Sequence, residues 1–207
     1  RMRLYLIRHG ETQYNATKQM QGWGEVPLND AGIAQAAQLA QRMPQFPLDH
    51  IYSSDLRRAV MTAAIIASTT DRPIAYEPLY RERNPGDLTN SFYEPSQAFF
   101  TDPHYQPPNG ESALTFTQRV HQAFEQLITQ EGHSDRHIAV VTHGMVCTEF
   151  VKGCLGFDPY QQQGFHWPNT ALTICDYTQD HWKLITLANA DHLHTPSRLD
   201  AHHQREP

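Results

Sequence analysis

The chain has 207 residues, of which 39% are hydrophobic and 18% are charged, and its formal net charge is −6. This length and composition are typical of a single globular domain with one substantial core. The negative charge argues against a general nucleic-acid binder, and no apolar run is long enough to span a membrane.

Hydrophobic periodicity predicts an alternation of strands and helices along the chain. The predicted strands are residues 3–7, 50–54, 73–77 and 137–142, and the predicted helices are residues 28–43, 55–69, 112–131 and 144–155. Residues 170–178 and 181–188 are typical of an antiparallel hairpin that turns at Gln179 and Asp180. This order predicts an α/β fold, a three-layer α/β/α sandwich with a mostly parallel sheet and helices on both faces.

Caps and apolar faces support three of these helices. We expect Asn29 or Asp30 to cap the first helix, and Ser53 or Ser54 to cap the second. The first helix has an apolar stripe, which consists of Ile33, Ala36, Ala37, Ala40 and Met43. The third has an apolar face, which consists of Phe116, Val120, Ala123 and Leu127.

Two segments do not fit the alternating pattern. Residues 84–110 contain five prolines and no clear period. A loop of that length in a compact domain is usually functional, so we expect a lid or insertion there. Residues 193–207 follow His192 in a His-rich, charged stretch and are expected to be a mobile tail. Residues 1–207 would then form one domain that carries this lid and this tail.

The cysteines Cys147, Cys154 and Cys175 form no CxxC pair, so the sequence favours neither a disulfide framework nor a zinc site. Cys147 and Cys154 lie on one face of a predicted helix, which indicates packing in the core. No signal-peptide pattern precedes the first predicted strand, and we therefore expect a cytoplasmic protein.

Two predicted strands end at a histidine. The first runs into Arg8 and His9, and residues 137–142 run into His143. Ligands of open α/β sheets bind at the carboxyl ends of the strands, so both imidazoles are expected in one crevice. Arg58 lies in the first turn of a predicted helix, where the helix dipole favours an anion and an arginine makes sense if it binds one. These four side chains together predict a phosphoryl-transfer site.

Five motifs follow one another along the chain. They are LIRHGET at residues 6–12, QGWGEVPLNDAG at 21–32, SSDLRRAVMTA at 53–63, PPNGES at 107–112 and VTHG at 141–144. In these motifs the chain resembles the histidine phosphatase superfamily, the phosphoglycerate mutase-like proteins, over roughly residues 3–192. The resemblance implies an enzyme with a phosphohistidine intermediate and a chemistry that needs no metal and no cofactor.

The resemblance also implies roles for individual residues. His9 would be the nucleophile, while Arg8, Arg58 and His143 would hold the phosphoryl oxygens and stabilise the charge that spreads during transfer. Further residues on the phosphate-binding side would be Asn15, Gln21, Gly22 and Gly144.

Glu82, in the segment LYRERNPG, matches the acid of the family. It would protonate the leaving alkoxide and then activate the attacking water. Glu77 and Glu111 stay open as alternatives for this role, because the first lies close by and the second could reach a pocket. Many members of the family continue with G-x-W-E-G or a similar pattern after the acid. Here Gly86 keeps its offset but residues 87–90 depart from that pattern, which puts the substrate in doubt.

Three function classes compete: a phosphomonoester hydrolase acting on a small organic phosphate, a phosphoglycerate mutase-type transferase, and a non-catalytic phosphate-binding relative. No expected catalytic group is missing, which argues against a binding-only protein. The mutases that the chain resembles carry a longer insertion with basic residues, whereas no Lys or Arg lies between Arg83 and Arg119. We therefore expect a phosphatase whose partner is a small phosphate ester.

The composition of residues 84–118 leads to a hypothesis about the substrate. The segment carries carboxylates but no Lys or Arg, and its aromatic residues are Phe92, Tyr93, Phe99, Phe100, Tyr105 and Phe116. An acidic wall repels a second phosphate, whereas aromatic faces favour an apolar or ring-bearing alcohol. The aromatics could instead only anchor the lid. Lys18 is the first cation after the His9 motif and could reverse the preference for monophosphates.

Overall fold

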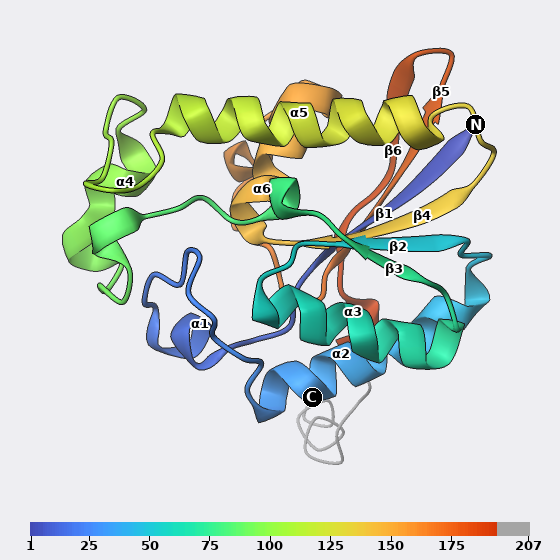
Figure 1. Cartoon of the computed structure of the whole chain (residues 1–207), viewed down its shortest axis with the longest axis horizontal. Helices are drawn as coiled ribbons and strands as arrows, with labels where there is room; N and C mark the ends of the chain where they lie inside the picture. Colours follow the sequence, from blue (N-terminus) through green and yellow to red (C-terminus); the bar gives the residue numbers. More distant parts are fainter. Residues whose placement is uncertain (194–207) are drawn as a thin grey trace, which may run out of the picture.

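The computed structural model describes residues 1–193, in which three layers are built around one six-stranded sheet (Figure 1). The strand order is β3-β2-β4-β1-β5-β6. The strands are β1 (Met2–Arg8), β2 (His50–Ser53), β3 (Ile74–Tyr76), β4 (His137–Thr142), β5 (Leu172–Thr178) and β6 (His181–Asn189). The first four in this order are parallel, and β5 and β6 are antiparallel to their neighbours. The predicted fold class is confirmed.

Helices cover both faces of the sheet. On one side lie α2 (Asp30–Arg42) and α3 (Arg57–Thr70), and on the other lie α5 (Ala113–Glu131) and α6 (Gly144–Phe150) (Figure 1). Two short helices, α1 (Gln13–Thr17) and α4 (Gln97–Thr101), belong to loops, and α6 continues as a π-helical turn over Val151–Leu155. Within residues 1–193, none of the helices combines the length and the apolar character that crossing a membrane requires.

The two faces of the sheet have separate cores because side chains alternate along each strand. Leu4 and Leu6 of β1 pack under α5 and α6, whereas Tyr5 and Ile7 pack on α2 and α3. The predicted apolar face of α5 is buried in the first of these cores, through Phe116, Val120, Ala123 and Leu127. The predicted hairpin is also confirmed, and Gln179 and Asp180 both have the positive φ angles of a tight hairpin turn.

Helix α2 is rotated relative to the predicted stripe. Ile33 is 43% exposed and Ala37 is also exposed. The buried residues are Gly32, Ala36, Leu39 and Ala40, followed by Met43. Gly32 lies against the backbone of Glu11, and a Cβ there would be 2.0 Å from the Glu11 carbonyl oxygen. This close approach turns Ile33 outward. Asn29 is the N-cap, and its side chain accepts from the N–H of Gly32 at 2.8 Å.

Neither predicted serine caps α3. The helix begins at Arg57, and its N-cap position, Leu56, makes no capping hydrogen bond through its side chain. The hydroxyl of Ser54 accepts from the N–H of Leu56 at 3.2 Å, one residue before the helix begins. The same hydroxyl contacts His143, as described below. The Ser54 side chain therefore contacts His143, the residue after β4, and does not cap α3.

Residues 84–110 contain α4 and the short helical turns Gly86–Leu88 and Glu94–Ser96, and Figure 1 shows them on the side of the molecule toward which β1 and β4 point. Of the predicted tail, residues 193–207, only Leu193 lies within the described residues. His192, the residue just before the predicted tail, is half-buried in a short helical turn. Its ring contacts Arg42 and the hydroxyl of Thr170, the latter at 2.9 Å.

Candidate active site

His9 and His143 lie side by side at the carboxyl ends of two neighbouring parallel strands. β1 and β4 pair with Arg8 opposite Thr142, so the residues that follow both strands emerge at the same edge of the sheet. The ring centroids of the two histidines are 5.1 Å apart, and the backbone N–H of His9 donates to the carbonyl of Thr142 at 2.9 Å. The structure thus brings together the two imidazoles, as the two His-Gly strand ends predict.

His9 is 2% exposed, and its protonation follows from one hydrogen bond. Its Nδ1 lies 2.7 Å from the carbonyl oxygen of Gly10, which can only accept, so the proton of the neutral ring is on Nδ1 and the lone pair is on Nε2. Burial, followed by the charges of Arg58 and Arg8, lowers the pKa of His9 well below 6.5. At neutral pH the ring is uncharged, which is the form that can attack phosphorus.

His143 is fully buried behind His9 and does not itself line the cavity. Its Nε2 lies 2.8 Å from the hydroxyl oxygen of Ser54, while its Nδ1 has no partner among residues 1–193. Burial lowers its pKa well below 6.5, and the nearby charge of Arg58 acts in the same direction. The hydrogen bond between Ser54 and His143 was not predicted from the sequence, although Ser54 belongs to the SSDLRRAVMTA motif.

The guanidinium groups of Arg8 and Arg58 lie at the edge of the sheet where His9 and His143 are found. Arg58 is 1% exposed and donates through Nη2 to the carbonyl of Gly22 at 2.8 Å and through Nη1 to that of Gly24 at 3.2 Å. Arg8 donates through Nη1 to the carbonyl of Trp167. Both Nε atoms are buried without a protein partner, and neither side chain has a carboxylate within ion-pair distance in residues 1–193. This arrangement favours an external anion.

Burial lowers the pKa of Arg58 to about 10, so the group stays charged at neutral pH. Glu82 is the carboxylate whose charge opposes this shift most. The structure therefore concentrates positive charge around His9 and places one carboxyl group within its field.

Glu82 lines the same cavity with its carboxyl group held by backbone donors. Oε1 accepts from its neighbour, the N–H of Arg83, at 2.9 Å, and Oε2 accepts from the N–H of Met145, in the first turn of α6, at 3.1 Å. Burial raises the pKa of Glu82. The two backbone donors and the charges of Arg58 and Arg8 act in the opposite direction, but burial is the larger effect and the pKa is raised overall. A carboxyl group with a raised pKa can donate a proton and later accept one.

The alternative acids lie elsewhere. Glu77 accepts from the N–H of Leu79 and from Gln126, and Glu111 pairs with Arg119. Neither residue lines the cavity. The geometry therefore favours Glu82 over both.

The remaining residues expected near the phosphate also lie at the cavity. The Oδ1 atom of Asn15 accepts from the N–H of Thr12 at 3.0 Å, and the Oε1 atom of Gln21 accepts from the hydroxyl of Thr12 at 2.6 Å. Both amide nitrogens are thereby left for a ligand. Gly144 lines the cavity beside Arg8, and a Cβ there would lie in ordinary van der Waals contact with Nε of that arginine, at 3.4 Å.

The cavity has a volume of about 640 Å³ and extends beyond the residues expected from the motifs. Its outer wall is formed by Thr148, Glu149, Lys152, Asp158, Tyr160 and Trp167. The first three continue one face of α6 from Gly144 and Met145 at helical spacing, so extending the helical period from the VTHG motif could have found them. The last three come from the loop before β5 and carry no such signal.

Comparison with known proteins places these residues in a family. Residues 4–190 match the histidine phosphatase superfamily (branch 1). The chain is 30% identical to a protein of Cronobacter sakazakii named "Probable phosphoglycerate mutase GpmB", over 95% of this chain and 97% of that one. The alpha-ribazole phosphatase from Shigella flexneri superposes with a TM-score of 0.81 at 28% identity, over 91% of this chain and 97% of that one. A phosphoserine phosphatase from Entamoeba histolytica in complex with phosphoserine gives a TM-score of 0.80 at 27% identity, over 93% and 100%.

Proposed function

Because the chain belongs to the histidine phosphatase superfamily, we propose that it hydrolyses a small organic phosphomonoester through a phosphohistidine intermediate. One observation carries this proposal: a neutral His9 with a free Nε2 lines the cavity together with Arg8 and Arg58, whose buried Nε–H groups have no partner in residues 1–193. These groups suit the oxygens of a phosphoryl group, and they match the charge that spreads over those oxygens during transfer.

The reaction would proceed in two transfers. In the first, His9 Nε2 forms a bond to phosphorus, the bond from phosphorus to the ester oxygen breaks, and Glu82 gives its proton to the leaving alkoxide. In the second, the Glu82 carboxylate takes a proton from water, the water oxygen bonds to phosphorus, and the bond to His9 breaks. The carboxyl group thereby regains its proton, and the imidazole returns to its neutral form.

The names of the relatives support two reactions, because one is named a mutase and two are named phosphatases. The cavity favours hydrolysis. Arg83 lines it, but its donors are used by the carbonyls of Phe99, Tyr105 and Glu111. Beyond the phosphoryl group, Lys152 is the remaining lysine or arginine of the cavity wall in the described residues.

A panel of metabolite monophosphates tests the proposed reaction. We expect release of inorganic phosphate from at least one member and an acid-labile, base-stable phosphoenzyme during turnover. In parallel, 3-phosphoglycerate is incubated with and without a bisphosphate primer. Isomerisation that depends on the primer and exceeds hydrolysis would contradict the hydrolase assignment and establish the mutase.

We propose further that residues 84–110 act as a lid that selects monophosphates over bisphosphates. Of the lid aromatics, Tyr93, Phe99 and Phe100 line the cavity, whereas Lys18, the cation that could reverse the preference for monophosphates, does not. Lys152 takes its place, with Nζ 3.8 Å from a carboxylate oxygen of Glu149. Asp158 lies on the same wall and adds a second negative charge. One partly neutralised lysine is a poor site for a second phosphate.

Matched mono- and bisphosphates of one alcohol test this preference, with kcat/KM measured for each. We expect the wild type to favour the monophosphate, and we expect Lys152→Met to change the ratio by about tenfold or less, since an exposed charge pair contributes up to about 1 kcal/mol. Lys18→Met is the matched control and leaves the ratio unchanged. A preference for the bisphosphate that disappears in Lys152→Met would refute the lid hypothesis.

A further inference from the structure

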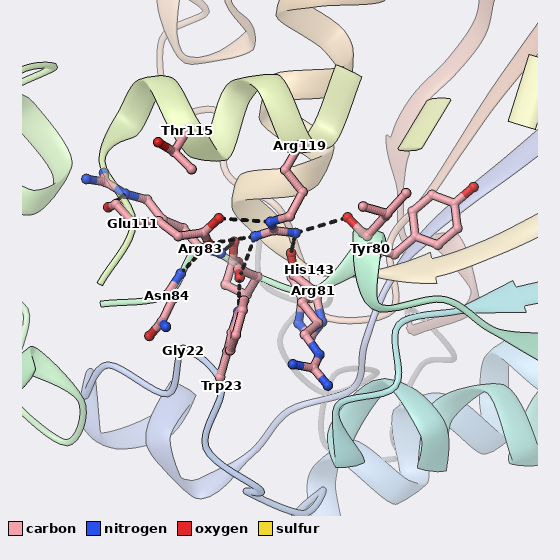
Figure 2. A network of polar contacts seen from close by, with 12 residues as sticks. Gly22, Trp23, Tyr80, Arg81, Arg83, Asn84, Glu111, Thr115, Arg119 and His143 are labelled. Carbon is pink, nitrogen blue, oxygen red and sulfur yellow. Dashed lines mark hydrogen bonds and ion pairs between the residues drawn. The ribbon is translucent and has the colours of Figure 1, made fainter. Parts of the chain in front are cut away.

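The backbone of the segment that carries Glu82 is held by one arginine of helix α5. Arg119, on α5, donates through Nη1 to the carbonyls of Leu79 and Arg81, at 3.0 and 2.8 Å, and through Nη2 to that of Glu82 at 3.0 Å. Figure 2 shows this guanidinium between Glu111 and the turn that contains Arg81. Three carbonyls of one short segment thus accept from one rigid, planar group.

Glu111 fixes the guanidinium from the other side. Its carboxylate oxygens accept from Nη2 and Nε of Arg119 at 2.7 and 2.9 Å, and the Arg119 and Glu111 side chains are 14% and 12% exposed. Glu111 also accepts from the N–H of Asn84 at 2.8 Å, two residues after the acid. A bidentate, largely buried ion pair of this kind has one favoured geometry. It therefore restricts the movement of the backbone segment that Arg119 contacts.

Trp23 adds a second donor and connects the acid to the phosphate side of the cavity. Its Nε1–H donates to the carbonyl of Glu82 at 2.8 Å, and its ring lies 4.7 Å from the guanidinium carbon of Arg81. The preceding residue, Gly22, gives its carbonyl to Arg58. Two adjacent residues therefore contact the acid segment and the phosphate-binding arginine.

Gly22 keeps this connection short. It has a φ of +48°, and a Cβ at this position would lie 2.0 Å from Cδ of Pro85, in the chain just after the acid. A side chain there would push the two segments apart. Glycine is thus needed both for the left-handed conformation and for the close approach.

We propose that Arg119 and Trp23, with Glu111 behind them, are positioning residues that set the distance between the Glu82 carboxyl group and the phosphoryl group. This inference rests on the proposed function, because it assumes that Glu82 is the general acid of that reaction. Arg119 and Glu111 do not line the cavity, and they act only through the backbone of the acid segment. A displaced acid would fail to protonate the leaving oxygen while the nucleophile and the phosphate donors stay intact.

The experiment compares phosphoenzyme formation from an alkyl and an aryl phosphate in pre-steady-state kinetics. An aryl oxide leaves with little help from an acid, so only the alkyl rate depends strongly on the position of Glu82. For Arg119→Lys, which keeps the charge but loses the fork, we expect the alkyl rate to fall roughly tenfold more than the aryl rate. For Trp23→Phe, which removes one hydrogen bond and keeps a ring under Arg81, we expect the same direction and about a two- to tenfold effect.

Arg3→Lys is the matched control. Arg3 forms a comparable bidentate pair with Asp176, at 2.7 and 2.8 Å, near the start of β1 rather than at its end. This variant should lose stability in a similar way and keep the alkyl-to-aryl ratio of the wild type.

The outcomes separate the two proposals. An unchanged ratio in both Arg119→Lys and Trp23→Phe, in a wild type that forms the phosphoenzyme, overturns the positioning role alone. A wild type that hydrolyses its substrate without any phosphoenzyme overturns the proposed mechanism and the positioning role with it. A ratio that changes equally in Arg3→Lys also contradicts the positioning role, because the effect would then be one of general stability.

Discussion

Replacing His9 by alanine is expected to abolish turnover and to eliminate the phosphoenzyme. The neutral Nε2 of His9 is the nucleophile of the proposed mechanism, and the variant removes the only path to the covalent intermediate. We expect kcat to fall on the order of 10⁶-fold, as removal of the nucleophile does in other covalent enzymes. The measurements are steady-state hydrolysis and acid-quenched trapping of labelled phosphate.

Two controls keep this result interpretable. His181→Ala changes an exposed histidine at the first residue of β6 and should retain wild-type rates. His9→Asn fills more of the buried space and should be as inactive as His9→Ala, which distinguishes loss of chemistry from loss of structure. Normal rates in folded His9→Ala would refute the proposed mechanism.

Glu82→Gln is expected to slow the first transfer most for substrates with poor leaving groups. General acid catalysis contributes typically about 10²–10⁴-fold, and we expect a loss in that range for alkyl phosphates. Aryl phosphates should lose much less in pre-steady-state phosphoenzyme formation. Glu77→Gln is the matched control and should leave both rates unchanged, since Glu77 does not line the cavity. Equal losses for both substrate classes would contradict the assignment of Glu82.

The pH dependence of the first transfer follows from the same two groups. The step needs neutral His9 and protonated Glu82. The pKa of His9 lies well below 6.5, so the rate rises through that low pKa as the imidazole loses its proton. The pKa of Glu82 is raised by burial, so the rate falls only as the pH passes this raised pKa and the carboxyl group ionises. In Glu82→Gln the falling limb should disappear while the rising limb remains.

The local sequence pattern was sufficient to predict the positions of the candidate site residues that follow strand ends. Each buried strand is recognisable from its apolar run, and parallel pairing then places His9 and His143 at one edge of the sheet. Arg58 was found in the same way, because it lies in the first turn of a helix that follows a strand. These positions depend on a few neighbouring residues, which the sequence displays directly.

Other features depend on contacts between distant segments. The buried face of α2 includes Gly32, which approaches the backbone of Glu11. The hydrophobic periodicity of the helix does not reveal this contact. Arg119 and Glu82 are 37 residues apart, and the contact between them requires α5 to cross above the acid segment. Lys18 is the first cation after the His9 motif in the sequence, but the lysine that lines the cavity is Lys152, in the π-helical turn that continues α6. Tertiary packing decides such positions, and single-segment patterns do not carry that information.

Arg8 and Arg58, which have no carboxylate within ion-pair distance in residues 1–193, also matter for the stability of the folded chain. Burying positive charges near one another without a carboxylate partner lowers the free energy of unfolding. An anion that binds only the folded chain restores that free energy by mass action. Under the proposed function, substrate, product and inorganic phosphate would therefore stabilise the folded chain as well as take part in the reaction. We therefore expect its resistance to heat and to proteolysis to rise with the concentration of phosphate around it.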